Sequence, residues 1–359
     1  MAAGSQAQHE ERGEGWEVQY FYDENKSALT ITDLKFPSDR RGVASAYISE
    51  KEKIKPVVLI TNDGGKHWLA EPVKEAGISL FFLDDSLGWM VTTKGVWQTE
   101  ESGRNWHKLK APKDILQVWF TSRNRGWAIG DRKSVFETSD GGATWTPVAI
   151  AAKPAGNPEY TTYGSISFSG DKSGVISGWN TPPRRVDPYP DWMDPEKART
   201  RRQWPALSIF LQTTDGGKTW VSSTASLFGR LIRMSFAPNF GLGLMEFNDD
   251  FEWPSEVYKV DPKSGKSTRA FREKNRAITD VYAGANGPSF LAGFEPVGTV
   301  RQNPIPGRLK ILKSDDLEHW REMPVDYRAE AHRAVIAASP QGSVWVATDL
   351  GMILKLPGR

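Results

Sequence analysis

The residues best placed to do chemistry are acidic side chains that recur at a fixed distance before a tryptophan. Asp63, Asp140 and Asp215 each precede a tryptophan by five positions, in the segments TNDGGKHW, TSDGGATW and TTDGGKTW. Regularly spaced carboxylates could bind a metal ion. Calcium loops, however, place several oxygen ligands at alternate positions, whereas each of these segments offers one carboxylate. No metal is expected there, and the segments are interpreted as structural turns.

The octapeptide, called the Asp box below, has the chemistry of a tight turn between two β-strands. Hydroxyl or carboxylate side chains can accept hydrogen bonds from the backbone N–H groups of the turn, and the glycines adopt positive φ at no steric cost. The tryptophan then brings a large apolar surface into the next strand, where it can pack against a neighbouring unit. The acid and tryptophan of each predicted box are, in chain order, Asp63 and Trp68, Glu101 and Trp106, Asp140 and Trp145, Asp215 and Trp220, and Asp315 and Trp320.

Other residues give little sign of catalysis. The HExxH, phosphate-loop and GxSxG patterns are absent. Among the five histidines, His332 alone is expected to reach the mouth of a central channel, and a structural role is the usual one for such a lone histidine. Glycosidases ordinarily need two placed carboxyl groups. The polar residues expected to line the channel include one carboxylate and are Asp33, Ser79, Gln117, Ser165, Arg233 and Thr279. We therefore predict no catalytic residue and no cofactor.

The elements that position these residues follow from a repeat of about forty residues. Trp68 and Trp106 are 38 residues apart, and Trp106 and Trp145 are 39 residues apart. This period is typical of one four-stranded propeller blade. Before each box an aromatic residue lies six positions before a glycine, as in Phe36 with Gly42, Phe82 with Gly88, Phe120 with Gly126 and Phe168 with Gly174. Weaker versions at Phe236, Tyr282 and Ala337 bring the number of units to seven.

We therefore predict an all-β fold, a seven-bladed β-propeller with four-stranded antiparallel blades. The last unit lacks a fourth strand, whereas residues 16–22 (WEVQYFY) are strand-like. The N-terminal strand is thus predicted to complete the C-terminal blade and close the ring. Residues 1–15 are expected to form a disordered tail, and residues 16–359 a single propeller domain.

Three long insertions depart from the compact repeat, at residues 178–206, 246–255 and 293–308. They follow the second strand of consecutive units, so they are expected on the face opposite the Asp boxes, where long loops on a rigid scaffold often bind partners. The longest interleaves arginine with aromatic residues, which are enriched at protein interfaces. A merely solvated loop is the alternative. The predicted partner-binding residues are Arg184, Arg185, Tyr189, Trp192, Arg199, Arg201, Arg202 and Trp204.

Composition narrows the class of partner. A net charge of +2 and a mean hydropathy of −0.51 give no general attraction to nucleic acid or anionic lipid. The chain has no cysteine, which excludes disulfides and a thiolate nucleophile. No apolar stretch approaches the length of a membrane span, and residues 1–15 lack the apolar core of a signal peptide. We expect a soluble monomer that binds neither nucleic acid nor the membrane interior.

The boxes, of the form S/T-x-D-x-G-x-T-W, resemble bacterial neuraminidase (BNR-type) repeats. Their order with the preceding aromatic and glycine, as in FFLDDSLGWMVTTKGVWQTEESGRNW, more specifically resembles the photosystem II stability and assembly factor family. The resemblance runs from Trp16 onward and is strongest over residues 34–145. It implies a propeller without enzymatic activity, exported or lumenal, that docks on other proteins, partly through an arginine-rich surface, while a membrane complex assembles. Photosystem biology itself is not implied.

The predicted function is therefore a non-catalytic scaffold that binds partner proteins, periplasmic or otherwise exported, with a cytoplasmic location as the alternative. The competing functions are a sialidase-like glycoside hydrolase and a carbohydrate-binding propeller that stacks sugars on Trp192, Trp204 and Trp253. Sialidases of that class resemble one another in an R-I-P segment before the first box, and no such segment precedes Thr61.

Overall fold

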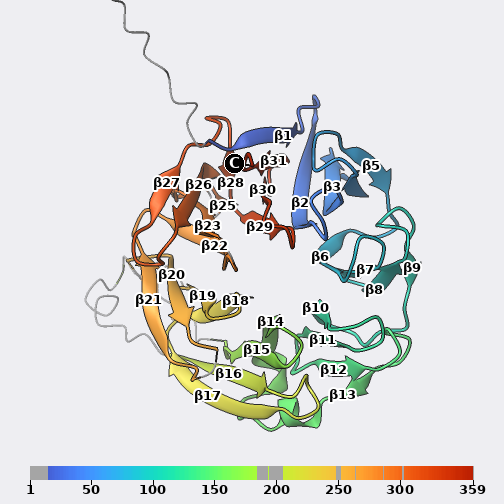
Figure 1. Cartoon of the computed structure of the whole chain (residues 1–359), viewed down its shortest axis with the longest axis vertical. Helices are drawn as coiled ribbons and strands as arrows, with labels where there is room; N and C mark the ends of the chain where they lie inside the picture. Colours follow the sequence, from blue (N-terminus) through green and yellow to red (C-terminus); the bar gives the residue numbers. More distant parts are fainter. Residues whose placement is uncertain are drawn as a thin grey trace, which may run out of the picture.

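The computed structural model describes residues 15–183, 193, 205–247, 252–262, 264–285, 287–300 and 303–358. They form seven sheets arranged in a ring (Figure 1), each with a path of four antiparallel strands. This confirms the predicted seven-bladed propeller. In six blades the first strand in the chain is the innermost and the last is the outermost, and in the blade that contains both chain ends the N-terminal strand is the outermost.

The first three blades are the most compact. Blade 1 contains β2 (Ser27–Lys35), β3 (Gly42–Glu50), β4 (Lys53–Thr61) and β5 (Leu69–Pro72). Blade 2 contains β6 (Gly77–Phe82), β7 (Gly88–Thr92), β8 (Gly95–Thr99) and β9 (His107–Lys108). Blade 3 contains β10 (Ile115–Phe120), β11 (Gly126–Gly130), β12 (Val135–Thr138) and β13 (Thr146–Pro147). The short 3-10 helices η1 (Ala149–Ala152) and η2 (Pro158–Tyr160) lead to the next blade.

The remaining blades carry the predicted insertions. Blade 4 contains β14 (Thr161–Ser169), β15 (Ser173–Asn180), β16 (Ala206–Thr213) and β17 (Val221–Leu227). Blade 5 contains β18 (Arg230–Phe236), β19 (Gly241–Glu246), β20 (Ser255–Val260) and β21 (Ser267–Arg272). Blade 6 contains β22 (Ala277–Tyr282), β23 (Ser289–Phe294), β26 (Gly307–Ser314) and β27 (Arg321–Met323), and β28 (Glu330–Ala331) pairs with β26. Between β23 and β26 lies a hairpin of β24 (Thr299–Val300) and β25 (Asn303–Pro304).

Blade 7 is built from both ends of the chain. It contains β29 (Ala334–Ala338), β30 (Val344–Thr348), β31 (Met352–Lys355) and β1 (Glu17–Phe21). Strand β1 pairs antiparallel with β31, with Tyr20 opposite Ile353. Trp16, which is 5% exposed, precedes β1 as the box tryptophans precede the outermost strands of other blades. The predicted closure of the ring by the N-terminal strand is confirmed.

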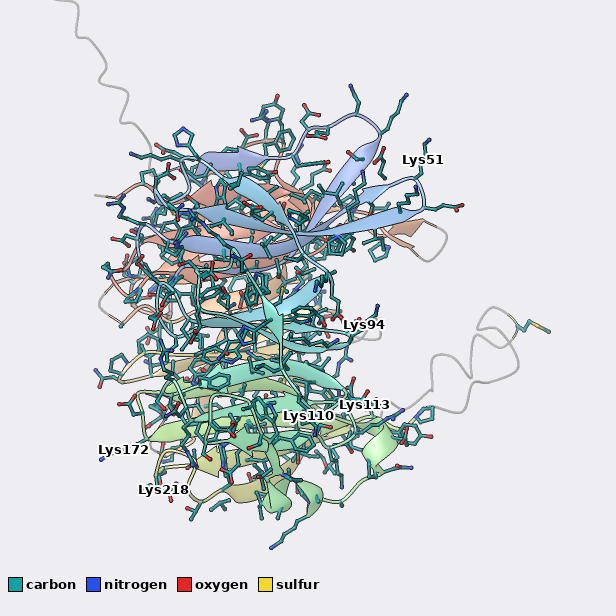
Figure 2. All side chains as sticks on the ribbon, turned by 90° about the vertical axis from the view of Figure 1, so that its right-hand side faces the viewer. Lys51, Lys94, Lys110, Lys113, Lys172 and Lys218 are labelled. Carbon is teal, nitrogen blue, oxygen red and sulfur yellow. The ribbon has the colours of Figure 1, made fainter. Side chains whose placement is uncertain are left out.

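The ring has two different faces. On the box face, the Asp-box turn lies beside the turn between the first two strands, since the Gly216 N–H donates to the Lys172 carbonyl over 2.9 Å. Figure 2 shows Lys172 and Lys218 on this side. Lys51 and Lys94 lie in the turns between the second and third strands of their blades. These turns are on the opposite side of the ring, which is called the loop face below. The described ends of the connections β15–β16, β19–β20 and β23–β26 have the same position in their blades, so they lie on the loop face.

The core lies between the blades. Each of the six hydrophobic clusters of buried residues joins two neighbouring blades. They occupy the interfaces 1/2, 2/3, 3/4, 5/6, 6/7 and 7/1, numbered by the blades that they join. Within the part of the chain that the structure describes, interface 4/5 has no such cluster.

Candidate functional site

The Asp boxes use their polar side chains within the turn. In blade 4 the Thr213 hydroxyl donates to Asp215 Oδ1 over 2.8 Å and accepts the N–H of Gly217 over 2.9 Å. Asp215 also accepts the N–H and the hydroxyl of Thr219. These hydrogen bonds lower the pKa of Asp215 to about 2, and the bond from the Thr219 hydroxyl has the largest effect. Gly216 and Gly217 have φ of +73° and +74°, a conformation that favours glycine. The box is a structural turn.

The last box corrects one prediction. Asp316, not Asp315, takes the structural role, because Asp316 Oδ1 accepts the Ser314 hydroxyl over 3.1 Å and the His319 N–H over 2.8 Å. This box is one residue shorter between its hydroxyl residue and Trp320 than the other boxes. A count of five residues backward from Trp320 therefore reaches Asp315. A count of two residues forward from the hydroxyl residue Ser314 reaches Asp316.

The innermost strands carry two buried carboxylates, whereas the sequence predicted one. Asp33 is 6% exposed and Asp280 is 2% exposed. A β-bulge between Ile278 and Asp280 matches the bulge between Ile31 and Asp33, so Asp280 is the counterpart of Asp33. Aligning the sixth unit on Tyr282 had put Thr279 in this position. Tyr282 pairs with Phe290 as Lys35 pairs with Val43, so the counterpart of Phe36 is Ala283 and not Tyr282, and the prediction was wrong by one residue.

Both carboxylates link neighbouring blades. Asp33 Oδ2 accepts the Leu80 N–H of blade 2 over 2.7 Å, and Asp280 Oδ2 accepts the Ile336 N–H of blade 7 over 2.8 Å. Lys35 lies 2.7 Å from Asp33, and Arg233 donates to Asp280 over 2.8 Å. Burial alone would raise the pKa of Asp33, but Lys35, Arg233 and the hydrogen bonds outweigh it and lower that pKa. A lowered pKa does not suit a general acid.

Three interfaces are filled by stacked aromatic rings. At interface 3/4, Trp127 of β11 stacks on Phe168 of blade 4 with ring centres 4.9 Å apart. The box tryptophan Trp220 meets both rings edge-on, at 5.9 and 6.1 Å. Equivalent sets are Trp89, Phe120 and Trp145 at interface 2/3, and Trp345, Phe36 and Trp68 at interface 7/1. The indole that crosses to the next blade thus comes from the second strand, whereas the box tryptophan covers its own blade's aromatic residue.

Interface 4/5 has neither indole. Val175 follows Gly174 in β15, at the position that Trp127 holds after Gly126 in β11. Blade 5 has no Asp box, and Lys266 precedes its outermost strand where the other boxes have tryptophan. Each other interface keeps an indole at the latter position, namely Trp106, Trp145, Trp220, Trp320, Trp16 or Trp68. The missing rings leave the space between blades 4 and 5 unfilled.

That space is a groove with a volume of about 540 Å³. Its apolar wall includes Val175, Phe210, Met234, Phe236 and Met245, and hydroxyl groups from β17 and β20 border it. Asp261 is the one charged residue among the described residues that line the groove. A volume of this size and a largely apolar wall with a single charged residue suit the side chains of a ligand. We take this groove as the candidate functional site.

A second cavity, of about 340 Å³, lies at interface 1/2, where Val43 replaces the crossing indole. The carboxylate of Glu75, which lines this cavity, already has hydrogen-bond partners. Glu75 accepts hydrogen bonds from the Trp97 indole over 3.0 Å and from Lys108 over 2.9 Å. Burial opposes ionisation, but the bonds from Thr92, Lys108 and Trp97 outweigh it and lower the pKa of Glu75 to about 2. This pocket is a structural feature of the interface.

The predicted partner-binding residues of the long insertion, Arg184 through Trp204, lie outside the described residues. Trp253, considered as a sugar platform, has one face covered by the Arg272 guanidinium, whose carbon lies 3.9 Å from the ring centre. His332 lies between the Asp349 carboxylate and the Pro304 carbonyl, each 3.2 Å away, which is a structural environment. In the described ranges, no set of three potential ligands is arranged to hold a metal.

Fold and site together define a seven-bladed propeller of Asp-box repeats with one open interface. Comparison with known proteins indicates which family this chain resembles. The family model described as photosynthesis system II assembly factor YCF48 matches residues 107–181. The photosystem II assembly protein Ycf48 of Synechococcus sp. (strain JA-3-3Ab) is 24% identical over 207 residues, which cover 52% of this chain and 58% of that protein. Ycf48 of Thermosynechococcus vestitus is 21% identical over 269 residues, 69% of this chain and 71% of that protein.

Solved structures agree on the fold. YCF48 from Cyanidioschyzon merolae has a TM-score of 0.59 at 15% identity and covers 95% of this chain and 98% of its own. The structure described as YCF48 bound to D1 peptide has a TM-score of 0.57 at 16% identity, covering 94% and 99%. The propeller domain of a protease from Pyrococcus furiosus scores 0.56 at 11% identity, covering 92% and 96%. Together these findings confirm the resemblance to the photosystem II assembly factor-like family.

The first of the curated relatives extends well beyond the matching segment, since this chain covers 58% of its length. Some of the similar propellers belong to hydrolases, such as the protease from Pyrococcus furiosus. In the described part of this chain, no helix is long and apolar enough to cross a bilayer.

Proposed function

We propose that this protein is a non-catalytic propeller scaffold that binds a segment of a partner protein in the groove between blades 4 and 5, during assembly of a membrane complex. The observation that carries the proposal is the open interface itself. Six interfaces bury a hydrophobic cluster, whereas this one keeps Phe210, Phe236 and Val175 partly exposed around a 540 Å³ groove. Exposed apolar surface rimmed by polar groups marks protein-binding sites.

Two further observations support binding rather than hydrolysis. The buried carboxylates of the innermost strands are each engaged by a neighbouring blade's N–H and by a cation. A glycosidase needs carboxyl groups that are placed to exchange protons with substrate. The relatives are described as assembly factors, and one solved relative is described as bound to a D1 peptide. By analogy with these proteins, the ligand of this groove would be a polypeptide.

The arginine-rich insertion remains part of the proposal as a second contact. Arg199, Arg201 and Arg202 would hold carboxylates of the partner, and that part of the binding should weaken as salt rises, because exposed charges are screened over about 8–10 Å at ordinary ionic strength. An exported location also remains part of the proposal, and cell fractionation of the native organism tests it.

The experiment compares groove and insertion directly. Full-length chains are crosslinked to partners in extracts of the native organism, and the crosslinked sites are mapped by mass spectrometry. Val175→Trp supplies the missing ring and should remove crosslinks to blades 4 and 5, whereas Val175→Ile, the matched control, should keep them. Replacing the three arginines by alanine should reduce only the salt-sensitive crosslinks.

Two results would contradict the proposal. The first is a crosslink pattern that stays unchanged in Val175→Trp, which would show that the groove is not the binding site. The second is turnover of fluorogenic glycosides that disappears when a single carboxylate, such as Asp33, is replaced. The D1 peptide serves as an additional probe of whether this chain shares the partner of the solved relative.

A further inference from the structure

The outermost strand of blade 4 is the longest outermost strand that the structure describes. Strand β17 has seven residues, whereas β9 and β13, the outermost strands of blades 2 and 3, have two residues each. Figure 1 shows β17 along the outside of the ring. In the described part of the chain, β16 is the strand that pairs with β17, along its whole length. The other edge of β17 therefore presents backbone N–H and C=O groups outward.

Among the described residues, this edge lacks the charges, prolines and bulges that commonly prevent pairing, and the short helix η1 lies near β17. Its sequence is VSSTASL, without charge or proline, and its register with β16 has no bulge. The comparably long outer strands differ. Strand β21 carries Arg269 and Arg272 and pairs with β20 through a register shift, and β1 carries Glu17 and also has a register shift. Charges and bulges are the devices by which proteins block edge pairing. As far as the described residues extend, β17 is thus open to an added strand.

The groove reaches this edge. Ser223 and Thr224 are consecutive in β17, so their side chains point to opposite faces of the sheet, yet both residues line the groove. Ala225 and Leu227 line it as well. A segment that paired with β17 would therefore lie along the groove's mouth. Alternate side chains of that segment would point into the groove, whose more outward wall in blade 5 includes Tyr258 and Val260 of β20.

We propose that β17 accepts an extended, uncharged segment of the partner protein as a fifth strand of blade 4, with alternate apolar side chains in the groove. This inference rests on the proposed function and specifies the binding mode. Backbone hydrogen bonds would supply affinity and the groove would select side chains, as in other cases of strand addition. The segment must be uncharged at the inward positions, because the groove wall offers little compensation for a buried charge.

The test uses a defined probe and the full-length chain. The probe is a fluorescent, acetylated and amidated octapeptide of alternating threonine and valine, and its control is the same peptide with every internal amide N-methylated. Methylation removes the N–H groups but keeps the side chains. We expect the unmethylated probe to bind at least about tenfold more tightly, equivalent to about 1.4 kcal/mol. Equal binding of the two peptides would overturn strand addition.

A pair of edge variants localises the interaction. Thr224→Lys puts a charge on the edge of β17 and should weaken probe binding at least about tenfold. Thr146→Lys puts the same charge on the short outer strand of blade 3 and should leave binding unchanged. Equal effects of the two substitutions would contradict the assignment. Circular dichroism and thermal unfolding establish that both variants are folded.

The remaining outcomes separate the two proposals. If Val175→Trp removes partner crosslinks while Thr224→Lys does not, the groove binds a partner but strand addition is wrong. If Thr224→Lys weakens the probe while Val175→Trp leaves partner crosslinks intact, the edge accepts a strand and the proposed function is wrong. A concentration-dependent dimer in sedimentation that Thr224→Lys abolishes would assign the edge to a second copy of this chain and overturn the proposal.

Discussion

The two sides of blade 4 are packed in opposite ways. Toward blade 3, Trp127 is fully buried and stacks on Phe168, and Trp220 closes the set. Toward blade 5, Val175 and Lys266 stand at the two indole positions, and Phe236 faces a groove. An aromatic ring buries about 150–250 Å². The presence or absence of these rings decides whether the space between two similar sheets becomes core or binding surface.

Interface 4/5 lacks the stabilisation that these aromatic rings give, and other contacts in the ring compensate for it. Interface 4/5 is linked near the centre by the Ser177 hydroxyl, which donates to the Leu231 carbonyl over 3.2 Å. Interface 6/7 instead has the Asp280 carboxylate, which accepts the Ile336 N–H and is also paired with Arg233 of blade 5. Because β1 closes the ring in blade 7, blades 4 and 5 are held together by their other neighbours as well as by each other.

The largest expected effect comes from removing the crossing indole on the closed side. Trp127→Ala should lower the free energy of unfolding by about 3–5 kcal/mol, because it leaves a cavity in a buried cluster. On the open side, Val175→Ala removes two methyl groups beside an existing groove and should cost about 1–2 kcal/mol. Urea denaturation measures both. Equal losses would mean that the two sides of blade 4 are packed alike after all.

Near the centre of the ring, a substitution at interface 6/7 should also destabilise the protein more than a substitution at interface 4/5. Asp280→Ala leaves Arg233 without its carboxylate and the Ile336 N–H without an acceptor, so a loss of about 2–4 kcal/mol is expected. Ser177→Ala at interface 4/5 removes one neutral hydrogen bond and should cost about 1 kcal/mol. Thermal and urea unfolding of the two variants test this order. A costlier Ser177 substitution would reverse the comparison.

The turns on the box face offer a smaller contrast. Thr213→Val keeps the shape of the box residue but removes the acceptor of the Gly217 N–H, and about 1–2 kcal/mol of stability should be lost. Blade 5 has no box, and Ser264→Ala in its turn should change stability by less than about 0.5 kcal/mol. If the two substitutions had the same effect on the unfolding midpoint in urea, the box would not be a stabilising turn.

The smallest expected effect is a change in how the stability of the protein depends on pH under acidic conditions. The pKa values of Asp140 and Asp215 are about 2 in the fold against an ordinary value of 3.8. A folded pKa below the unfolded one gives stability that is complete above about pH 4 and is lost as pH falls toward 2. Thermal unfolding between pH 5 and 2.5 should therefore depend less on pH in the double variant Asp140→Asn, Asp215→Asn. An unchanged pH profile would show that these carboxylates do not contribute.

The fold was predictable because its signals are local. An Asp box closes its hydrogen bonds within seven residues, from Thr213 to Thr219, so its chemistry is visible in any single segment. The closing strand was predictable because the seventh unit lacked one strand and residues 16–22 offered it. Counting failed where the residue used as reference was out of register, as with Tyr282 before Asp280, or where the turn was one residue shorter, as at Asp316.

The sequence by itself determined the number of blades, the turns that shape them and the strand that closes the ring, since each depends on residues near one another in the chain or on a repeated spacing. Tertiary structure alone decided where the ring stays open. Val175 and Phe236 are far apart in sequence, and the gap between them appears only when blades 4 and 5 face each other. The sequence shows that the indoles are missing, at Val175 and at Lys266, but it does not show that both positions belong to one interface, because packing between sheets depends on pairs of side chains that only folding brings together.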